Sequence, residues 1–165
     1  MSDIKRCPHF ELEVGGATIN PETVHEIARF TIFWGKFEFY NKCNKYSMPE
    51  DLPKIARKIE TINDEVFKNL AMVLDAQAAG KGYSVPGYIT DALKARDDEY
   101  ALYIERFMNS ECSNKNDWIL GAVCVIDCVR NNLFNGEKDV SILDKQIYLF
   151  RAVNNVLEEL IQNQS

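Results

Sequence analysis

The sequence lacks any long apolar run. None of its hydrophobic stretches approaches the ~20 residues that a helix needs to cross a bilayer, and residues 1–6 lead into no apolar segment of the kind that signal peptides contain. These absences argue against a membrane-spanning or exported protein. We therefore expect a cytoplasmic protein that does not enter a membrane.

Histidine is scarce, and the cysteines are not paired. The chain has 2 histidines and 5 cysteines, and it contains no Cys-x-x-Cys or His-x-x-x-His pair. Cys7 and His9 could supply two ligands to zinc, but the remaining ligands have no evident source, so we expect no metal site and no cofactor. An odd number of cysteines without an export signal indicates reduced thiols. Cys124 and Cys128, four residues apart, are expected to be small core residues.

An excess of basic residues is also missing. The 25 acidic residues outnumber the 19 basic ones, which gives a net charge of −6. This charge argues against non-specific coating of nucleic acid or of an anionic membrane, so a nucleic-acid substrate would need a local basic site. Basic clusters occur at residues 54–58, at Lys94 with Arg96, and at Arg130 with Lys138. We interpret the first two clusters as solvated helix faces.

The remaining composition is that of one globular domain. A chain of 165 residues that is 46% hydrophobic can bury roughly two thirds of its unfolded surface. In residues 1–20, apolar and polar residues alternate up to Gly15-Gly16, which predicts a short hairpin or an extended arm. Residues 21–165 are predicted to form an all-α, compact up-and-down bundle of five or six helices.

Helix start and stop signals give the expected boundaries. Asn20-Pro21 predicts a helix that runs to about Cys43 and is buried on most of its sides. Ser47 to Glu50 is expected to break the chain, and Asp117 is expected to cap the most hydrophobic helix. The remaining helices are predicted over residues 51–62, 63–80, 88–109 and 118–134, with a last helix over 143–161.

Glu38 lies inside an aromatic stretch of the first long helix. A desolvated carboxylate needs a charged or hydrogen-bonding partner. Two partners are open from the sequence: Arg130, if Glu38 is buried, and Lys42, four residues on, if Glu38 faces solvent.

The most hydrophobic helix runs directly into a polar segment, Arg130-Asn131-Asn132-Leu133-Phe134-Asn135-Gly136, followed by Lys138. A guanidinium in an apolar stripe favours a carboxylate or a phosphate in bidentate geometry. By these physical arguments alone, an arginine that pairs with a neighbouring helix, followed by an Asn-Gly helix stop, explains the segment better than a site does.

This segment resembles the signature of HEPN domains, small helical bundles of which many are ribonucleases in toxin–antitoxin, phage-defence and CRISPR-associated systems. The family pattern is Arg, often Asn, three further residues and then His. The resemblance implies a homodimer that joins two motifs in one cleft for RNA and cleaves by attack of a ribose 2′-OH without a metal. It also implies an antitoxin or regulatory protein as a possible partner.

The resemblance implies roles for particular residues. Arg130 would hold the scissile phosphate, Asn131 would orient it, and Asn135 occupies the position of the acid/base histidine; Glu38 joins them as a candidate catalytic residue. Asn132 and Lys138 are the candidate substrate-binding residues. Because asparagine cannot exchange a proton near neutral pH, the chain as written should be inactive or severely slowed.

Three explanations of Asn135 are open: an engineered inactivation, a natural loss, or chemistry that does not use that histidine. Two other functions also remain open. One is a non-catalytic module that binds RNA, a nucleotide or a protein partner through the same cleft. The other is a helical adaptor in which Arg130 serves a structural ion pair.

Overall fold

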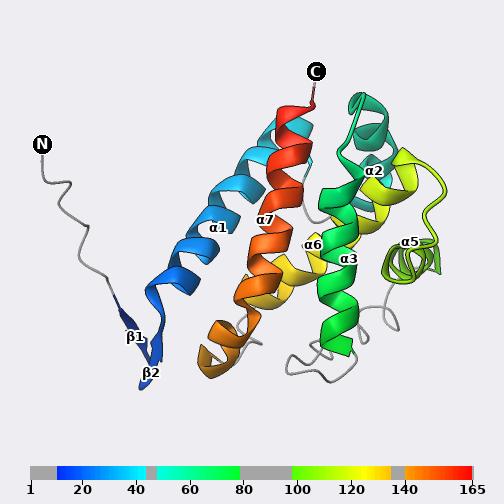
Figure 1. Cartoon of the computed structure of the whole chain (residues 1–165). Coiled ribbons are helices and arrows are strands. Elements are labelled where there is room, and N and C mark those ends of the chain that lie inside the picture. The colour runs from blue at the N-terminus through cyan, green and yellow to red at the C-terminus, as the bar shows by residue number, and fades with distance from the viewer. Residues whose placement is uncertain (1–10, 44–47, 79–97, 135–139, 165) are drawn as a thin grey trace, which may run out of the picture.

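The computed structural model describes residues 11–43, 48–78, 98–134 and 140–164. They form a compact helical bundle with a short hairpin at the N-terminal end, which confirms the predicted fold class (Figure 1). The described elements are β1 (Leu12–Val14), β2 (Ala17–Ile19), α1 (Pro21–Asn41), α2 (Met48–Lys58), α3 (Asp64–Ala78), α5 (Asp98–Met108), α6 (Lys115–Phe134), the 3-10 helix η1 (Val140–Gln146) and α7 (Ile147–Gln162).

Residues 12–19 form a hairpin, one of the two predicted alternatives, rather than an extended arm. β1 and β2 pair antiparallel around Gly15 and Gly16, whose φ angles of 58° and 80° suit glycine. An isolated hairpin of this size is marginal in water. It is held to the bundle by Ile19, which is 4% exposed, and by Asn20, whose backbone N–H donates to the Asp144 carboxylate at 3.0 Å.

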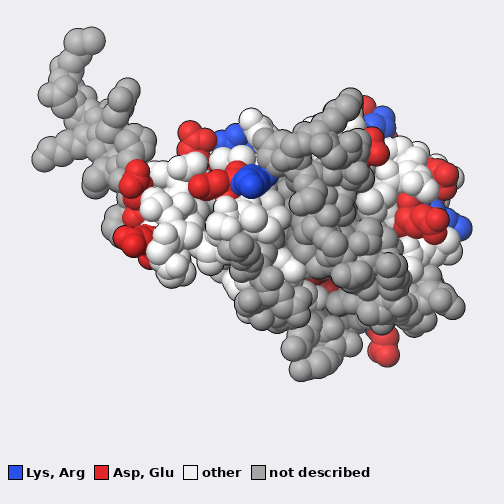
Figure 2. All heavy atoms as spheres, turned by 90° about the horizontal axis from the view of Figure 1, so that it is seen from below, with Lys and Arg blue, Asp and Glu red and all other residues white. Residues whose placement is uncertain are grey.

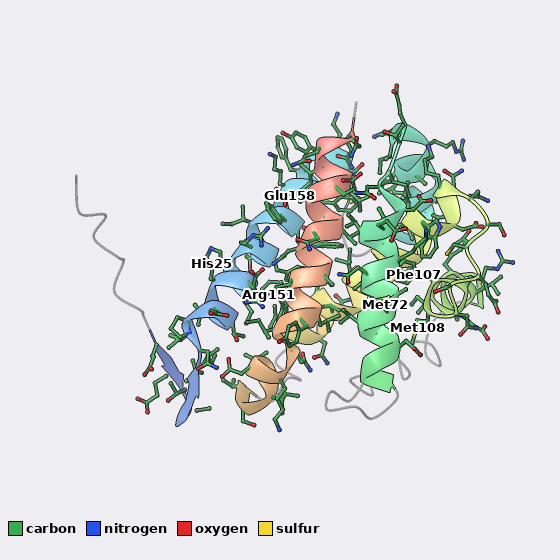
Figure 3. The ribbon with its side chains drawn as sticks, in the orientation of Figure 1. His25, Met72, Phe107, Met108, Arg151 and Glu158 are labelled. Carbon is green, nitrogen blue, oxygen red and sulfur yellow. The ribbon has the colours of Figure 1, made fainter. Side chains whose placement is uncertain are left out.

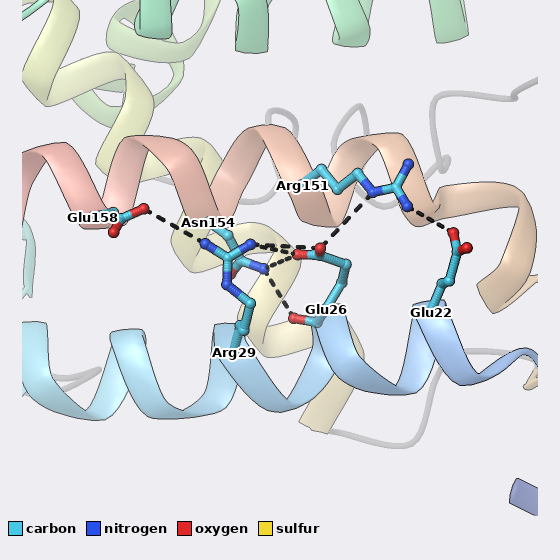
Figure 4. A network of polar contacts seen from close by, with 6 residues as sticks. All are labelled: Glu22, Glu26, Arg29, Arg151, Asn154 and Glu158. Carbon is cyan, nitrogen blue, oxygen red and sulfur yellow. Dashed lines mark hydrogen bonds and ion pairs between the residues drawn. The ribbon is translucent and has the colours of Figure 1, made fainter. Parts of the chain in front are cut away.

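Helices α1 and α7 run side by side in the same direction (Figure 1). A polar network joins them, and its residues follow one another in the same order along both helices (Figure 4). At its centre the Glu26 carboxylate, in a residue only 7% exposed, accepts a hydrogen bond from Asn154 Nδ2 at 2.8 Å and lies 3.1 Å from Arg29 Nη1. The same Asn154 amide also donates to the Glu26 carbonyl at 2.9 Å.

Helix α6 is the central element, as predicted. It is buried on nearly all sides from Trp118 to Val129, and it runs antiparallel to α1, since Arg130 lies near Glu38 while Phe134 stacks on Phe30. Helix α5 packs against it at Gly121. A Cβ at this glycine would lie 2.4 Å from Phe107 Cβ and 2.8 Å from the Tyr103 carbonyl oxygen, so no larger residue fits without a shift of α5.

Three helix starts differ from the predictions. Helix α6 begins at Lys115, because the Asn114 side chain accepts the Asp117 N–H at 3.1 Å while Asp117 accepts the Ser113 N–H at 3.1 Å. Asn114, not Asp117, is therefore the N-terminal cap. Helix α2 already begins at Met48, inside the predicted break, and α7 begins only at Ile147, because the residues before it form η1.

The expectation that the first long helix is buried on most sides is wrong. On α1, Ile32 is 66% exposed and Phe39 is 78% exposed, on the face opposite to buried Phe30 and Phe37. Tyr40 is also half-exposed, and Lys36 Nζ lies 5.5 Å from the centre of its ring. The aromatic richness of this helix therefore reflects one buried and one exposed apolar stripe.

None of the described cysteines, Cys43, Cys112, Cys124 and Cys128, is in a disulfide bond, and the last two are core residues of α6 as predicted. Within the described ranges, none of the helices combines the length and the hydropathy that a membrane span requires.

The network between α1 and α7 makes a prediction for stability. Asn154→Ala removes the amide that satisfies the buried Glu26 carboxylate and carbonyl, so it should lower the free energy of unfolding by about 1–3 kcal/mol. Chemical denaturation followed by circular dichroism measures the change. Asn155→Ala is the matched control, because Asn155 is the exposed neighbour on the same helix. Equal effects of the two substitutions would contradict a special role of the Asn154 amide.

Candidate functional site

The predicted motif lies at the C-terminal end of α6. Arg130, Asn131 and Asn132 are within the last turns of this helix, which the structure describes as far as Phe134. Asn135 and Lys138 lie outside the described residues, so the roles expected for them stay predictions. The structure therefore gives the geometry of the arginine half of the motif.

Arg130 faces Glu38 across the interface between α6 and α1. Arg130 Nη2 lies 3.9 Å from Glu38 Oε1, and the two side chains are 21% and 25% exposed. Of the two partners considered for Glu38, the structure supports Arg130, while Lys42 forms the left-handed C-cap of α1. At this distance the pair is an electrostatic contact without a hydrogen bond, and its partial exposure limits it to about 1 kcal/mol.

A chain of hydrogen bonds holds the guanidinium from the other side. Arg130 Nη1 donates to Asn131 Oδ1 at 2.8 Å, and Asn131 Nδ2 donates to Asp127 Oδ2 at 3.3 Å. Asp127 is 1% exposed. Asp127 is not among the residues predicted from the sequence, although the sequence carries two signals: this acid interrupts the apolar run from Val123 to Val129, and it stands four residues before Asn131, on the same helix face.

Asn132 lies on a more buried side of α6. It is 7% exposed, and its Oδ1 has no hydrogen-bond partner among the described residues. A buried carbonyl oxygen without a partner is uncommon and costs roughly 1–3 kcal/mol. In the described conformation this side chain contributes little surface for a substrate, and its binding role stays a prediction.

Acidic side chains from three helices gather near this site. Burial and, to a smaller extent, the negative charges of Glu38 on α1, Asp51 on α2 and Asp127 on α6 together raise the pKa of the Cys43 thiol to about 11. Cys43 is therefore a neutral thiol near neutral pH. It is not an activated nucleophile, although it lies close to the motif.

The one described histidine cannot take part in the chemistry of Arg130 within the same chain. His25 stands 13 residues before Glu38 on α1, which separates them by about 20 Å along the helix. Figure 3 shows His25 in the first half of α1, beside Arg151 of α7. His9 lies outside the described residues. The described part of the arginine site is therefore built from a guanidinium, two carboxylates and the Asn131 amide.

Other candidate residues lie away from the motif. Lys54 pairs with Asp51 at 3.2 Å and, like Arg57, is exposed on α2, in agreement with a solvated helix face. Lys94 and Arg96 lie outside the described residues. On the face shown in Figure 2, acidic side chains outnumber the basic ones, which lie beside them, so the described atoms form no continuous basic surface there.

Two hollows of small-molecule size lie elsewhere. One, of about 520 Å³, lies where α1, α2 and α7 meet and is lined by Lys36, Tyr40, Asn41 and Lys58 among others. The other, of about 630 Å³, lies at the N-terminal ends of α1 and α7, beside Asp144 and Arg151. Within the described part of the chain, no group of three His, Cys, Asp or Glu side chains could hold a metal ion.

No protein-family model, curated protein or solved structure matches this chain. The resemblance to HEPN domains therefore rests on residues 130–138 and on the position of Arg130 at the end of a buried helix.

The environment of Cys43 predicts slow alkylation. Raising the thiol pKa from 9.0 to about 11 lowers the thiolate fraction at pH 8 by about 100-fold, because only the thiolate reacts. In the folded chain, iodoacetamide should therefore modify Cys43 at least about 100-fold more slowly than in the urea-unfolded chain. Peptide mass spectrometry over a time course measures both rates. A folded-state rate near the unfolded one would refute the burial and charge environment described for this thiol.

Proposed function

We propose that this chain is a HEPN-type, metal-independent endoribonuclease in which Arg130 binds the scissile phosphate and Asn135 blocks the chemical step. The observation that carries the proposal is the anchoring of Arg130: a guanidinium at the motif position, held by Asn131 and Glu38, with its side chain still partly exposed. An arginine fixed in this way can present its remaining donors to an anion.

The contact with Glu38 is one that a phosphate could replace. At 3.9 Å it is longer than a charge-assisted hydrogen bond, whereas a phosphate can accept two parallel N–H bonds from a guanidinium at about 2.7–2.9 Å. A phosphate that replaces Glu38 as the partner of Arg130 would therefore form shorter hydrogen bonds with the guanidinium. The nearby carboxylates of Glu38 and Asp127 oppose phosphate binding, so a single motif should bind RNA weakly.

Two motifs across a homodimer would provide two guanidinium groups at one phosphate cleft. A two-fold axis places the same residues on both sides, so each protomer would contribute its own Arg130. This arrangement offsets the acidic surroundings of each motif and explains how a protein of net charge −6 could hold RNA at one local site.

In this mechanism the ribose 2′-OH loses its proton and attacks phosphorus, while the bond to the leaving 5′-oxygen breaks and that oxygen gains a proton. The products are a 2′,3′-cyclic phosphate and a 5′-OH. Arg130 stabilises the charge that develops on the phosphoryl oxygens. The asparagine side chain at position 135 can hydrogen-bond, but it performs neither proton transfer near neutral pH.

The second candidate function is a non-catalytic module that binds RNA through the same arginine. Asn135 favours it, because an amide preserves hydrogen bonding at that position while it removes acid/base chemistry. The two functions share the phosphate contact and differ in the effect of restoring a histidine.

Restoring the histidine is the direct test of the nuclease. Asn135→His should yield metal-independent cleavage of RNA in the presence of EDTA, with 2′,3′-cyclic phosphate ends identified by mass spectrometry. Adding Arg130→Ala should abolish this cleavage, whereas Arg57→Ala, which removes an exposed arginine of α2, should not. A folded, dimeric Asn135→His protein that is inert on RNAs of varied sequence would count against the nuclease and leave the binding module.

Binding by the unaltered chain is tested separately. Loss of Arg130 should weaken binding of a short single-stranded RNA and lower the slope of log K against log salt by about 0.7, the contribution of one phosphate contact. Fluorescence anisotropy at several salt concentrations measures both quantities. An affinity that is unchanged in Arg130→Ala would remove the site from both candidate functions.

The substitution Glu38→Gln tests whether Glu38 only competes with phosphate for Arg130 or also takes part in the chemistry. Removing its charge frees Arg130, so RNA affinity should rise by up to about fivefold, the equivalent of a partly exposed ion pair. In the Asn135→His background, KM should fall by the same factor if Glu38 only competes with phosphate. A fall in kcat at saturating RNA would instead assign Glu38 a part in the chemistry.

A further inference from the structure

Asp127 is a carboxylate placed where the helix could have held an apolar residue. It is 1% exposed and lies between core residues Ile126 and Cys128 of α6. Burial of a carboxylate is costly unless hydrogen bonds and charges compensate for the lost hydration. Such a residue calls for an explanation, and its contact with Asn131 Nδ2 at 3.3 Å suggests one.

The contact decides which way round the Asn131 amide lies. An asparagine side chain can rotate to exchange its oxygen and its NH₂ group, and the two orientations differ in what they offer to a neighbour. A carboxylate oxygen accepts from an N–H donor, so the contact with Asp127 favours the orientation in which Nδ2 points toward it. Asn131 Oδ1 is then directed to Arg130, where it accepts from Nη1 at 2.8 Å. In the reverse orientation, two donors would face each other.

We propose that Asp127 is a positioning residue that fixes the direction of the Arg130 guanidinium through the Asn131 amide. This role rests on the proposed function, because a fixed guanidinium is useful only if Arg130 binds phosphate. Asp127 need not touch RNA. Without it, the Asn131 amide that accepts from Arg130 would lose the contact that holds its other end, and the 3.9 Å contact with Glu38 would be the described contact of the guanidinium that does not depend on this amide.

A swap of the two side chains gives a sharp test. Asp127→Asn alone weakens the preference for the described orientation of the Asn131 amide, because an amide at position 127 can donate as well as accept. The double variant Asp127→Asn with Asn131→Asp keeps the total charge and rebuilds the chain of hydrogen bonds: the amide at position 127 donates to the carboxylate at position 131, which accepts from Arg130. Relative to wild type, the single variant should loosen Arg130 and the double variant should restore it.

The primary measurement does not depend on RNA or on activity. The ¹⁵N–¹H heteronuclear NOE of the Arg130 Nε–H group reports how rigid the side chain is, and the exposed Arg57 provides a mobile reference in the same sample. We expect a high value in wild type, a value close to that of Arg57 in Asp127→Asn, and recovery in the double variant. A folded Asp127→Asn protein with an unchanged Arg130 value would overturn the proposal.

A second variant keeps the test decisive if Asp127→Asn does not fold. Asn131→Ala leaves the buried carboxylate in place and removes only the link to Arg130, so it should loosen Arg130 to the same extent; a rigid Arg130 in this variant would also overturn the proposal. The double variant should fold, and its Arg130 should be as rigid as in wild type. A folded double variant with a mobile Arg130 would contradict the proposed chain of hydrogen bonds from Asp127 through Asn131 to Arg130.

Kinetic measurements connect the chain of hydrogen bonds from Asp127 to Arg130 with the proposed function. In the Asn135→His background, Asp127→Asn should lower kcat/KM by about tenfold, in the range for a displaced substrate-positioning group, and the double variant should recover it. If Asn135→His is inert, the nuclease fails while the NOE comparison still decides the role of Asp127. If Asn135→His is active and Arg130 is equally rigid in all variants, the positioning role fails alone.

Discussion

The constraint on which the rest of the structure depends is the burial of α6. Its residues from Trp118 to Val129 are enclosed by other elements, so every other helix must leave room for this one, and α5 approaches so closely that position 121 has to be glycine. Close packing of this kind fixes the axis of the helix and the direction of its side chains. Whatever stands at its C-terminal end is therefore held in a defined place relative to α1.

The end of α6 is also where its polar groups are concentrated. Asp127, Arg130, Asn131 and Asn132 occur within two turns, directly after a stretch from Trp118 to Ile126 that is apolar, and three of them are joined to one another by hydrogen bonds. The helix α1 that faces them contributes Glu38 and is itself fixed to α7 by the buried Glu26 network. The position of Glu38 thus depends on contacts made three turns earlier along α1.

Local signals in the sequence predicted much of the fold. Asn20-Pro21 and Asn63-Asp64 mark helix starts because capping depends on a few adjacent residues, and Gly15-Gly16 marks the hairpin because its φ angles suit glycine. The exposed stripe of α1 was not predicted, since Ile32 and Phe39 have the composition of core residues and only the tertiary packing shows that nothing described covers them. Asp127 was missed for a similar reason: the sequence gives its spacing from Asn131 but not its burial.

The arrangement around Arg130 is more than an ion pair would need. A partly exposed contact at 3.9 Å stabilises a fold by about 1 kcal/mol at most, and a buried carboxylate such as Asp127 generally stabilises less than an apolar residue of similar size would. Stability alone therefore favours apolar side chains at positions 127 and 130. The polar side chains instead fix the direction of the guanidinium, because the Asp127 carboxylate orients the Asn131 amide and this amide orients Arg130. A guanidinium with a fixed direction is useful when it must meet an anion of fixed geometry, as the phosphate-binding role proposed for Arg130 requires.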